Sequence, residues 1–436
     1  MTKGLSLDGW MVSGALRASW GAGSGPGSAA GALDDLFDAA EAARDDRERA
    51  FSLARDVAAA IPRPAQGRTL RYLETLATLG AADVTVARIV EPHVDAAMIL
   101  AECPDEVDLA AIGATHASTW GVFAAEGPGE PLRAIPDAGG WTLRGTKPWC
   151  SLAGELSHAL VTARVGSEAD AARGLFAVAL RQEGVHAHPE SWVARGFPTI
   201  PSGPTDFDGV RAVPVGQPGW YLERAGFEWG GIGVAACWFG GAVGVARRVV
   251  AAAQKRGDDI GYLHAGRVAA SVSAAGSALA SAARAIDAAA DVAAPTTRGV
   301  PSATDPAGAV AALPAGRRAF VIDAAAAAAP PAARVTSVVE AATDSAEAPA
   351  PAAREREAAA ALDATERALL AQVTRSVVRR ECEAILAEAA SALGPAPLAL
   401  DERYAARVAD LELYLRQDHG ARDELRAGRL LTGGAA

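Results

Sequence analysis

The sequence has little of what several large protein classes require. Only four of its 436 residues are cysteines, and these stand far apart with no Cys-x-x-Cys pair. This spacing disfavours a disulfide framework and a metal site, and it favours a reduced, cytoplasmic setting. The N-terminal stretch lacks the compact hydrophobic region of a signal peptide, and no uninterrupted apolar run is long enough to predict a transmembrane helix.

Basic residues are also in the minority. Asp and Glu number 52 against 41 Lys and Arg, which gives a formal net charge of −11. The chain therefore has no basic excess from which a phosphate-binding stripe could be built, and this argues against a nucleic-acid-binding role. We expect no metal, no nucleic acid and no membrane partner.

What the sequence does have is a change of hydrophobic period along the chain. After a Gly- and Ser-rich start over residues 1–30, expected to be flexible, the period is helical over 31–110. It becomes the alternation typical of strands over 111–220 and returns to helical over 221–436. Residues 291–360, rich in Ala and Pro, are interpreted as an insertion. The predicted fold class is α+β: a helical N-terminal domain, an antiparallel β middle domain and a C-terminal helical bundle.

Individual elements follow from local signals. Thr69 is a predicted N-cap of a helix that runs through Leu79, and residues 83–101 predict one long helix. Gly240, Gly241 and Gly244 predict a close crossing of helices rather than a phosphate loop. Alternating segments predict strands at Gly121–Ala125, Trp141–Leu143, Ala159–Val165, Gly174–Leu180 and Thr205–Phe207.

The segment GGWTLRGTKPWCS points most directly to a function. Trp141 and Leu143 alternate with polar neighbours, which predicts a strand, and residues 144–147 have the composition of a hairpin turn. A second strand would start near Trp149 and present Ser151 on the same face. An aromatic wall beside a hydroxyl donor suits a flat ring with a polar edge, such as a flavin. An ordinary hairpin with two core tryptophans is the alternative.

The same segment resembles the middle-domain hairpin of the acyl-CoA dehydrogenase superfamily. There, a Gly-(Thr/Ser)-Lys-x-Trp-(Ile/Cys)-(Ser/Thr) run places its tryptophan and its hydroxyl residue against the flavin. The resemblance implies that Trp149, Cys150 and Ser151 contact the cofactor. The order of helices, strands and helices also matches that family over nearly the whole chain, apart from the first thirty residues and the insertion.

A second stretch, about twenty residues earlier, carries part of the resemblance. The family has a strand that ends in Thr/Ser-Glu-Pro-x-x-Gly-Ser-Asp, and here Glu126 and Gly129 match. Ala125 replaces the hydroxyl residue and the final Ser-Asp is absent. The match implies that Phe123 and Ala125 contact the flavin through their backbone, without the side-chain hydrogen bond.

Activity implied by the resemblance is oxidation of an acyl thioester by FAD, with a glutamate that removes the α-proton while hydride passes to the flavin. The family's glutamate position on the C-terminal closing segment falls on Arg416, which stays protonated and cannot act as a base. The family's second position for this base falls in Ile232–Ala235, which also contains no carboxylate. The chain is therefore expected to be an atypical member.

Four other residues could take part in such chemistry. Asp418 and His419 lie close to Arg416, and Glu228 precedes the second position, so each could replace the missing base. His93 resembles a histidine that monooxygenases of the family carry on the corresponding helix, facing the flavin. The alternative is that Asp418 and His419 belong to a solvated helix end and that His93 is structural.

Cofactor and partners follow from the same resemblance. Four basic residues lie where the family binds the FAD pyrophosphate across a subunit interface: Arg247, Arg248, Lys255 and Arg256. We expect a homo-oligomer with FAD, a small-molecule substrate such as an acyl-CoA, and an electron-transfer partner. A flavin-dependent monooxygenase of the same fold and a catalytically inactive flavoprotein scaffold are the two alternative functions.

Overall fold

Helices begin the described part of the chain, which in the computed structural model comprises residues 29–137, 139–166, 171–293 and 362–433. The first four are α2 (Ala29–Ala42), α3 (Arg47–Ala60), α4 (Thr69–Ala82) and α5 (Val84–Glu102). Aspartates cap two of them: Asp46 accepts a hydrogen bond from the N–H of Arg49, and Asp83 from that of Val86. The long helix predicted at 83–101 is thus confirmed, with Asp83 as its N-cap.

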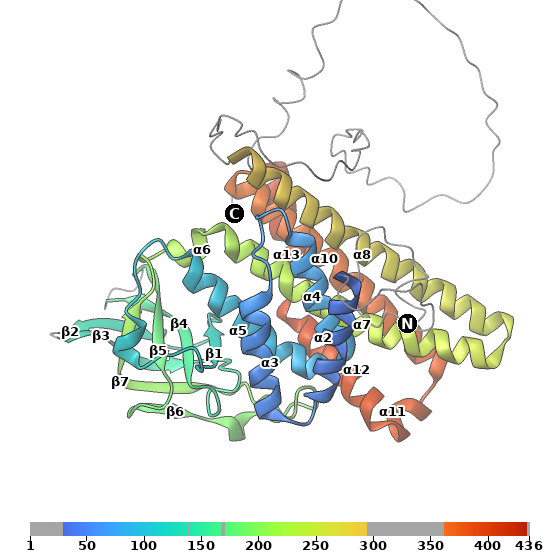
Figure 1. Cartoon of the computed structure of the whole chain (residues 1–436), viewed down its shortest axis with the longest axis horizontal. Coiled ribbons are helices and arrows are strands. Elements are labelled where there is room, and N and C mark those ends of the chain that lie inside the picture. The colour runs from blue at the N-terminus through green and yellow to red at the C-terminus, as the bar shows by residue number, and fades with distance from the viewer. Residues whose placement is uncertain (1–28, 138, 167–170, 294–361, 434–436) are drawn as a thin grey trace, which may run out of the picture. The chain divides into compact units, whose positions relative to one another are not determined.

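Strands of one sheet follow, and they lie to one side of the helices (Figure 1). They are β1 (Trp120–Phe123), β2 (Arg133–Asp137), β3 (Gly140–Lys147), β4 (His158–Val165), β5 (Arg173–Ala179), β6 (Val185–Ala187) and β7 (Thr205–Pro214). Neighbours follow the order β1-β4-β2-β3-β7-β5, with β6 beside β7. An additional pairing of β4 with β5 closes the sheet into a small barrel.

The prediction of an antiparallel middle domain is wrong for part of this sheet. β4 pairs in parallel with both β1 and β2, while the other pairings are antiparallel. A parallel pair needs a long crossover, and here β2, β3 and the loop after β3 provide the crossover from β1 to β4. Alternating hydrophobicity does not encode strand direction. The six consecutive buried residues of β4, 158–163, were the only hint of a central strand.

Most strand predictions are nevertheless confirmed. All five predicted segments overlap β1, β3, β4, β5 and β7. The two missed strands have simple reasons: β2 contains Pro136, which lowers its strand signal, and β6 is only three residues long.

Helices also complete the described chain. They are α6 (Trp220–Glu223), α7 (Ala225–Arg256), α8 (Asp259–Ala293), α10 (Ala364–Leu393), α11 (Ala396–Leu400), α12 (Glu402–Tyr414) and α13 (Ala421–Thr432). Helices α7, α8 and α10 pack against one another (Figure 1). Apart from the end of α8, the predicted insertion lies outside the described residues, as does nearly all of the predicted N-terminal segment.

Glycines let α4 and α7 approach closely. A Cβ atom on Gly240 would overlap the carbonyl oxygen of Ala77, and one on Gly80 would overlap the carbonyl oxygen of Cys237. The predicted close helix crossing is therefore confirmed. It also explains why α4 continues through Gly80 to Ala82 instead of ending at Leu79: this glycine is needed for helix packing and not as a terminator.

Helix α7 is the centre of the bundle. By length and composition it could cross a membrane, but 78% of its most apolar window is buried inside the protein. Residues of α7 share one hydrophobic core with α4, α5, α10 and the inner side of the sheet. The apolar character of α7 is explained by this core position.

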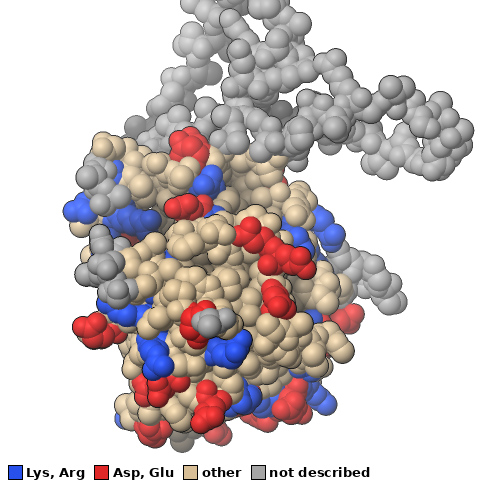
Figure 2. All heavy atoms as spheres, turned by 90° about the vertical axis from the view of Figure 1, so that its left-hand side faces the viewer, with Lys and Arg blue, Asp and Glu red and all other residues tan. Residues whose placement is uncertain are grey.

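Charged residues are mixed on the face formed by the strands. Figure 2 shows this face with Asp and Glu interspersed among Lys and Arg, and no continuous basic stripe crosses its described part.

Candidate functional site

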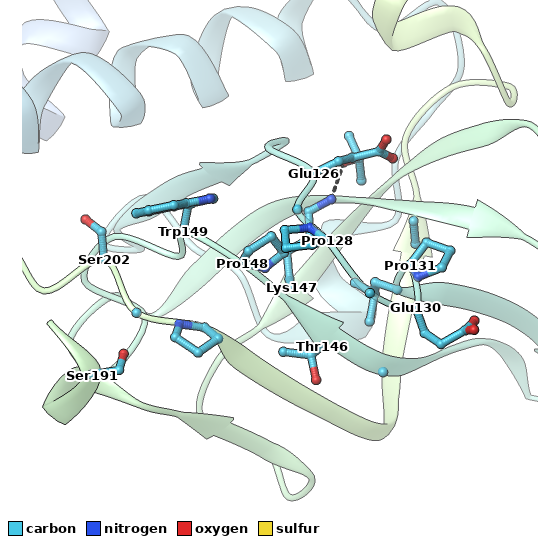
Figure 3. Close-up of a pocket in the computed structure, with 18 of the residues that line it drawn as sticks. Glu126, Pro128, Glu130, Pro131, Thr146, Lys147, Pro148, Trp149, Ser191 and Ser202 are labelled. Atoms are coloured by element: carbon cyan, nitrogen blue, oxygen red, sulfur yellow. Dashed lines mark hydrogen bonds between the residues drawn. The ribbon is translucent and has the colours of Figure 1, made fainter. Parts of the chain in front are cut away.

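A groove of about 820 Å³ opens on the barrel beside the loop that follows β1 and the loop that follows β3. Trp149 and Ser202 lie at one end of it, and Glu130 and Pro131 lie at the other (Figure 3). The volume falls within the range of roughly 300–1,000 Å³ that is typical of sites for small molecules and cofactors. The remaining walls are formed by residues 126–129, 145–148, 162–164 and 203–204, with Leu132, Ser191 and Trp192.

Trp149 is held in an unusual backbone conformation. Its side chain is 59% exposed, although it is one of the largest apolar groups of the chain. Its φ of 60° lies in the left-handed region, where non-glycine residues are uncommon. Leu152 and Phe197, in the loops that carry Trp149 and Ser202, share this conformation. Such strain costs about 1–3 kcal/mol per residue and is concentrated at functional sites, so this end of the groove is the leading candidate site.

The predicted hairpin is wrong in detail. β3 continues through Lys147, and residues 144–147 are paired with β7 instead of forming a turn. The ion pair of Arg144 with Asp208 and the hydrogen bond of Thr146 to Asp206 (2.6 Å) hold this end of the strand against β7. Trp149 follows in a loop, so the proximity of Trp149 and Ser151 comes from a tight turn and not from strand alternation.

Ser151 is part of a hydrogen-bonded group at the inner side of this loop. Its Oγ accepts a hydrogen bond from Nη2 of Arg88 (3.0 Å) and lies 2.7 Å from Oγ of Ser202. Ser202 in turn donates to the carbonyl oxygen of Ile200. The hydroxyl proton of Ser151 is therefore directed to Ser202, which lines the groove, so Ser151 adjoins the groove through Ser202.

The other predicted cofactor contacts differ in exposure. Cys150 is buried, its Sγ donates to the carbonyl oxygen of Lys147, and burial raises its pKa to about 12, so the thiol is protonated and structural. Phe123 is 2% exposed in the core, which leaves only its backbone for a ligand. Ala125 is exposed directly after β1 and beside the groove-lining Glu126. Their contacts with a cofactor stay predictions.

The floor of the groove carries positive charge. Lys147 is buried, its Nζ donates to Oγ1 of Thr162 (2.8 Å), and burial lowers its pKa to about 8. At the rim, Arg164 and Arg173 both form ion pairs with Glu126. Among the residues that line the groove, Lys147 and Arg164 are cations and Glu126 and Glu130 are carboxylates, so Lys147 on the floor is the cation placed to meet an anionic group.

Sequence reasoning missed a buried polar cluster behind Ser151. Arg88 lies 3.7 Å from Glu91 one turn further along α5, while the hydroxyl of Tyr414 on α12 lies 3.4 Å from the same carboxylate. The guanidinium of Arg88 is also 5.7 Å from the centre of the Tyr414 ring. Because Arg88 reaches both Ser151 and Glu91, it connects the groove with the interior of the helices.

Burial changes the acidity of two carboxyl groups of this cluster. Burial, only partly offset by Arg88, raises the pKa of Glu91 to about 7. Burial likewise raises the pKa of Asp95, one turn along α5, to about 6, although Arg224 opposes the shift. A carboxyl group that titrates near neutral pH beside a groove is a common property of functional sites. The spacing of Arg88, Glu91 and Asp95 on one helix face was the only sequence signal for the cluster.

Substitution Glu91→Gln is expected to remove one component of the pH dependence of stability. The folded state binds the Glu91 proton more tightly than the unfolded chain does, so this group lowers stability as pH rises from about 4.5 to 7, by on the order of 3 kcal/mol. Urea unfolding across this pH range should show a smaller decrease in the free energy of unfolding for Glu91→Gln than for the unmodified protein. Glu412→Gln, which alters an exposed carboxylate of α12, is the control. An identical decrease in Glu91→Gln and in the unmodified protein would show that Glu91 does not have a raised pKa in the folded state.

His93 lies on the side of α5 that packs on β1. Its Nδ1 accepts a hydrogen bond from the backbone N–H of Trp120 (3.1 Å), and its side chain is buried. Burial, with a smaller contribution from Arg55, lowers the pKa of His93 to about 4, so the ring is neutral with its proton on Nε2. The contact ties α5 to the sheet. A role of His93 in oxygen chemistry stays a prediction.

The predicted substitutes for the missing base lie apart from Trp149. Asp418 is buried against Arg379 of α10 (2.9 Å) and also accepts from the N–H of Gly420. His419 is exposed and its backbone N–H donates to Asp423. Arg416 forms an ion pair with Glu383. These contacts make the segment a charge-paired helix junction, and catalysis by Asp418 or His419 stays untested.

Glu228 stands in the first turn of α7 and is half buried. Burial raises its pKa, and its Oε2 atom has no hydrogen-bond partner among the described residues. Of the two carboxylates predicted from the sequence to replace the base, Asp418 is ion-paired with Arg379, whereas Glu228 has an oxygen atom without such a partner among the described residues.

Three of the four basic residues predicted to bind the pyrophosphate, the arginines, have contacts within the chain. Arg247 lies over the ring of Phe37, and Arg248 pairs with Asp401. Arg256 pairs with Asp258 directly after α7. Among the residues that the structure describes, no group of three or more His, Cys, Asp or Glu could hold a metal ion.

Comparison with solved structures identifies the fold. KijD3, solved in complex with FMN and dTDP-3-amino-2,3,6-trideoxy-4-keto-3-methyl-D-glucose, superposes with a TM-score of 0.64 at 15% identity, over 93% of this chain and 92% of KijD3. The dibenzothiophene monooxygenase TdsC from Paenibacillus sp. A11-2 superposes with a TM-score of 0.62 at 13% identity, over 92% of this chain and 96% of TdsC. XiaF from Streptomyces sp., in complex with FADH2 and glycerol, superposes with a TM-score of 0.62 at 14% identity, over 92% of each chain.

Sequence comparisons add nothing to this result: no family model matches the chain, and no curated protein matches it. At these identities the superpositions show the fold alone. The chain has the acyl-CoA dehydrogenase-like fold that the sequence resemblance implied, with a barrel of mixed strands in its middle.

Proposed function

We propose that this protein is a flavin-dependent oxidoreductase that oxygenates a small molecule with reduced flavin and O2. One observation carries the choice of reaction: neither position of the family's glutamate holds a carboxylate, because Arg416 is paired with Glu383 and Ile232–Ala235 is an apolar stretch of α7. Removal of an α-proton, which dehydrogenation requires, thus has no agent at the usual places. Oxygenation does not require that base.

The residues at the Trp149 end of the groove suit a flavin. The exposed indole offers an aromatic wall for a flat ring, and Ser151 and Ser202 offer hydroxyl groups for its polar edge. The positive charge of Lys147 lies on the floor of the same groove, where it would favour a phosphate of the cofactor.

Bound reduced flavin would supply two electrons to O2, so that one oxygen atom enters the substrate and the other leaves as water. The protein's own residues would bind and orient the ring through Trp149 and Ser151. Glu91 and Tyr414, both buried, would help to exclude water behind Arg88. The substrate is a small molecule that does not have to be an acyl-CoA.

We further propose FMN or reduced FAD as the cofactor, in place of a permanently bound FAD. The arginines expected to hold the pyrophosphate, Arg247, Arg248 and Arg256, have partners in the chain itself. KijD3 and TdsC were solved with FMN and XiaF with FADH2. A flavin reductase would then be the electron-transfer partner. FAD in a homo-oligomer stays the alternative.

Acyl-thioester dehydrogenation is the second candidate, because Glu91 could act as its base from an unusual position. A pKa of about 7 is close to the value that suits a general base at neutral pH. If this candidate is correct, Glu91→Gln should abolish reduction of the flavin by an acyl-CoA.

Anaerobic mixing of the flavin-loaded protein with a panel of saturated acyl-CoAs separates these functions. We expect the visible flavin absorbance to persist with every acyl-CoA, to be lost on chemical reduction, and to return when O2 is admitted. Rapid bleaching by an acyl-CoA would contradict oxygenation and favour dehydrogenation. Bound flavin that is neither reduced by an acyl-CoA nor reoxidised by O2 after chemical reduction would favour the inactive flavoprotein scaffold.

A further inference from the structure

We propose that Arg88 is a positioning residue that orients Ser151 and places a positive charge beside the bound flavin ring, and that Glu91 controls how far this charge is neutralised. The inference rests on the proposed flavin site and extends it to residues that do not touch the ring. It predicts that the protein prefers reduced over oxidised flavin to an extent that depends on the charge of Glu91.

The geometry around Arg88 supports the first part. Nη2 donates to Oγ of Ser151 (3.0 Å), and Nη1 lies 3.7 Å from Oε2 of Glu91. The Arg88 side chain is only 16% exposed, so the guanidinium has little water to screen it. A residue whose two terminal nitrogens face different partners couples those partners: a change at Glu91 alters the charge presented to Ser151.

Glu91 is the titratable group of the cluster that lies next to Arg88, and its charge changes near neutral pH. Its charged and titratable neighbours come from every element packed around it: Arg88 and Asp95 of α5, Tyr72 of α4, Tyr221 of α6, Cys237 of α7, Arg375 of α10 and Tyr414 of α12. Burial raises the pKa of Tyr72, Tyr414 and Cys237 well above their usual values, so these groups stay neutral. Arg375 is a permanent cation, and Asp95 is engaged mainly with Arg224.

The direction of the effect follows from charge. Reduced flavin carries more negative charge than oxidised flavin, so an uncompensated Arg88 favours the reduced form. Glu91 is protonated at pH values below about 7, and Arg88 is then least neutralised. As pH rises, Glu91 ionises and the preference for reduced flavin should decline. Glu91→Gln keeps this position uncharged, so the difference between its pH profile and that of the unmodified protein isolates Glu91, because Asp95 and Lys147 titrate in both proteins.

The test is a pair of anaerobic titrations of the full chain with oxidised and with dithionite-reduced FMN, across about pH 5.5 to 8.5. The measured quantity is the ratio of the two dissociation constants. In the unmodified protein this ratio should favour reduced FMN by about tenfold more at the acidic end than at the alkaline end. Glu91→Gln should favour reduced FMN as strongly as the unmodified protein does at the acidic end and more strongly than it does at the alkaline end. Arg88→Met should favour reduced FMN less than the unmodified protein does at the acidic end.

Matched variants separate charge from general damage. Arg44→Met removes another partly buried arginine, which pairs with Asp83 at the start of α5, and should leave the ratio and its pH profile unchanged. Arg88→Lys keeps the positive charge but cannot contact both Ser151 and Glu91. It should therefore weaken binding of oxidised and of reduced FMN, while its ratio of dissociation constants should lie between those of Arg88→Met and the unmodified protein. If Arg88→Met does not fold, Arg88→Lys and Glu91→Gln carry the test.

The outcomes are distinguishable. If the unmodified protein binds FMN but the ratio does not change with pH, or Glu91→Gln shows the same profile as the unmodified protein, the role of Arg88 and Glu91 is overturned and the flavin site stands. If the unmodified protein binds neither form of FMN, the proposed function fails together with this inference.

Discussion

Substitution Trp149→Ala is expected to weaken flavin binding by roughly tenfold to a hundredfold. Removal of a large apolar side chain from a buried contact costs about 1.5–3 kcal/mol, and every 1.4 kcal/mol corresponds to a tenfold change in the dissociation constant. The free protein should not lose stability, because the indole is 59% exposed. Fluorescence titration with FMN measures the affinity, and urea unfolding measures the stability.

A matched control comes from α8. Tyr262 is also an exposed aromatic residue, 57% exposed, and it does not line the groove. Tyr262→Ala should therefore leave flavin binding unchanged. Equal affinity of Trp149→Ala and the unmodified protein for FMN would remove this end of the groove from the flavin site.

Substitution Asp418→Ala is expected to destabilise the protein by about 3 kcal/mol, because it removes one partner of a buried ion pair and the hydrogen bond to Gly420. The cost should be no larger, because Arg379 keeps its contacts with Glu383 and Glu424. If the junction is structural, the flavin-dependent rate per folded molecule should change little. Urea unfolding and turnover of the folded fraction measure the two effects separately.

Glu412→Gln on α12 is the control, since it alters an exposed carboxylate of the preceding helix. Asp418→Asn, which keeps the shape of the side chain, distinguishes the alternatives. A loss of about a hundredfold in flavin reduction with unchanged stability would show that Asp418 is the shifted base and that the structural interpretation is wrong.

The fold was predictable to the extent that hydrophobic period determines element type. Long helices such as α5 and α7 and the alternating strand β7 were found because their patterns are strong. Strand direction could not be predicted, since parallel pairing of β4 depends on where the chain crosses the barrel. The end of α4 was misplaced because Gly80 serves the crossing with α7, and a single sequence does not show that contact.

The candidate site was predictable only where a continuous motif exists. Trp149 and Ser151 were named because two residues of one segment suffice to suggest them. The Arg88–Glu91–Tyr414 cluster was missed because its residues come from helices more than three hundred positions apart. The acidity of Glu91 arises from burial, which depends on packing and not on its neighbours in sequence. His93, which was predicted from the sequence, lies two residues further along α5 and packs against β1.

The most direct test of the account is a crystal structure of the full chain grown with FMN. We expect the ring to lie against the indole of Trp149, with Oγ of Ser151 within hydrogen-bond distance of the polar edge of the ring and Arg88 still bound to Ser151. A flavin bound elsewhere on the chain, with the Trp149 end of the groove free of ligand, would contradict the central claim.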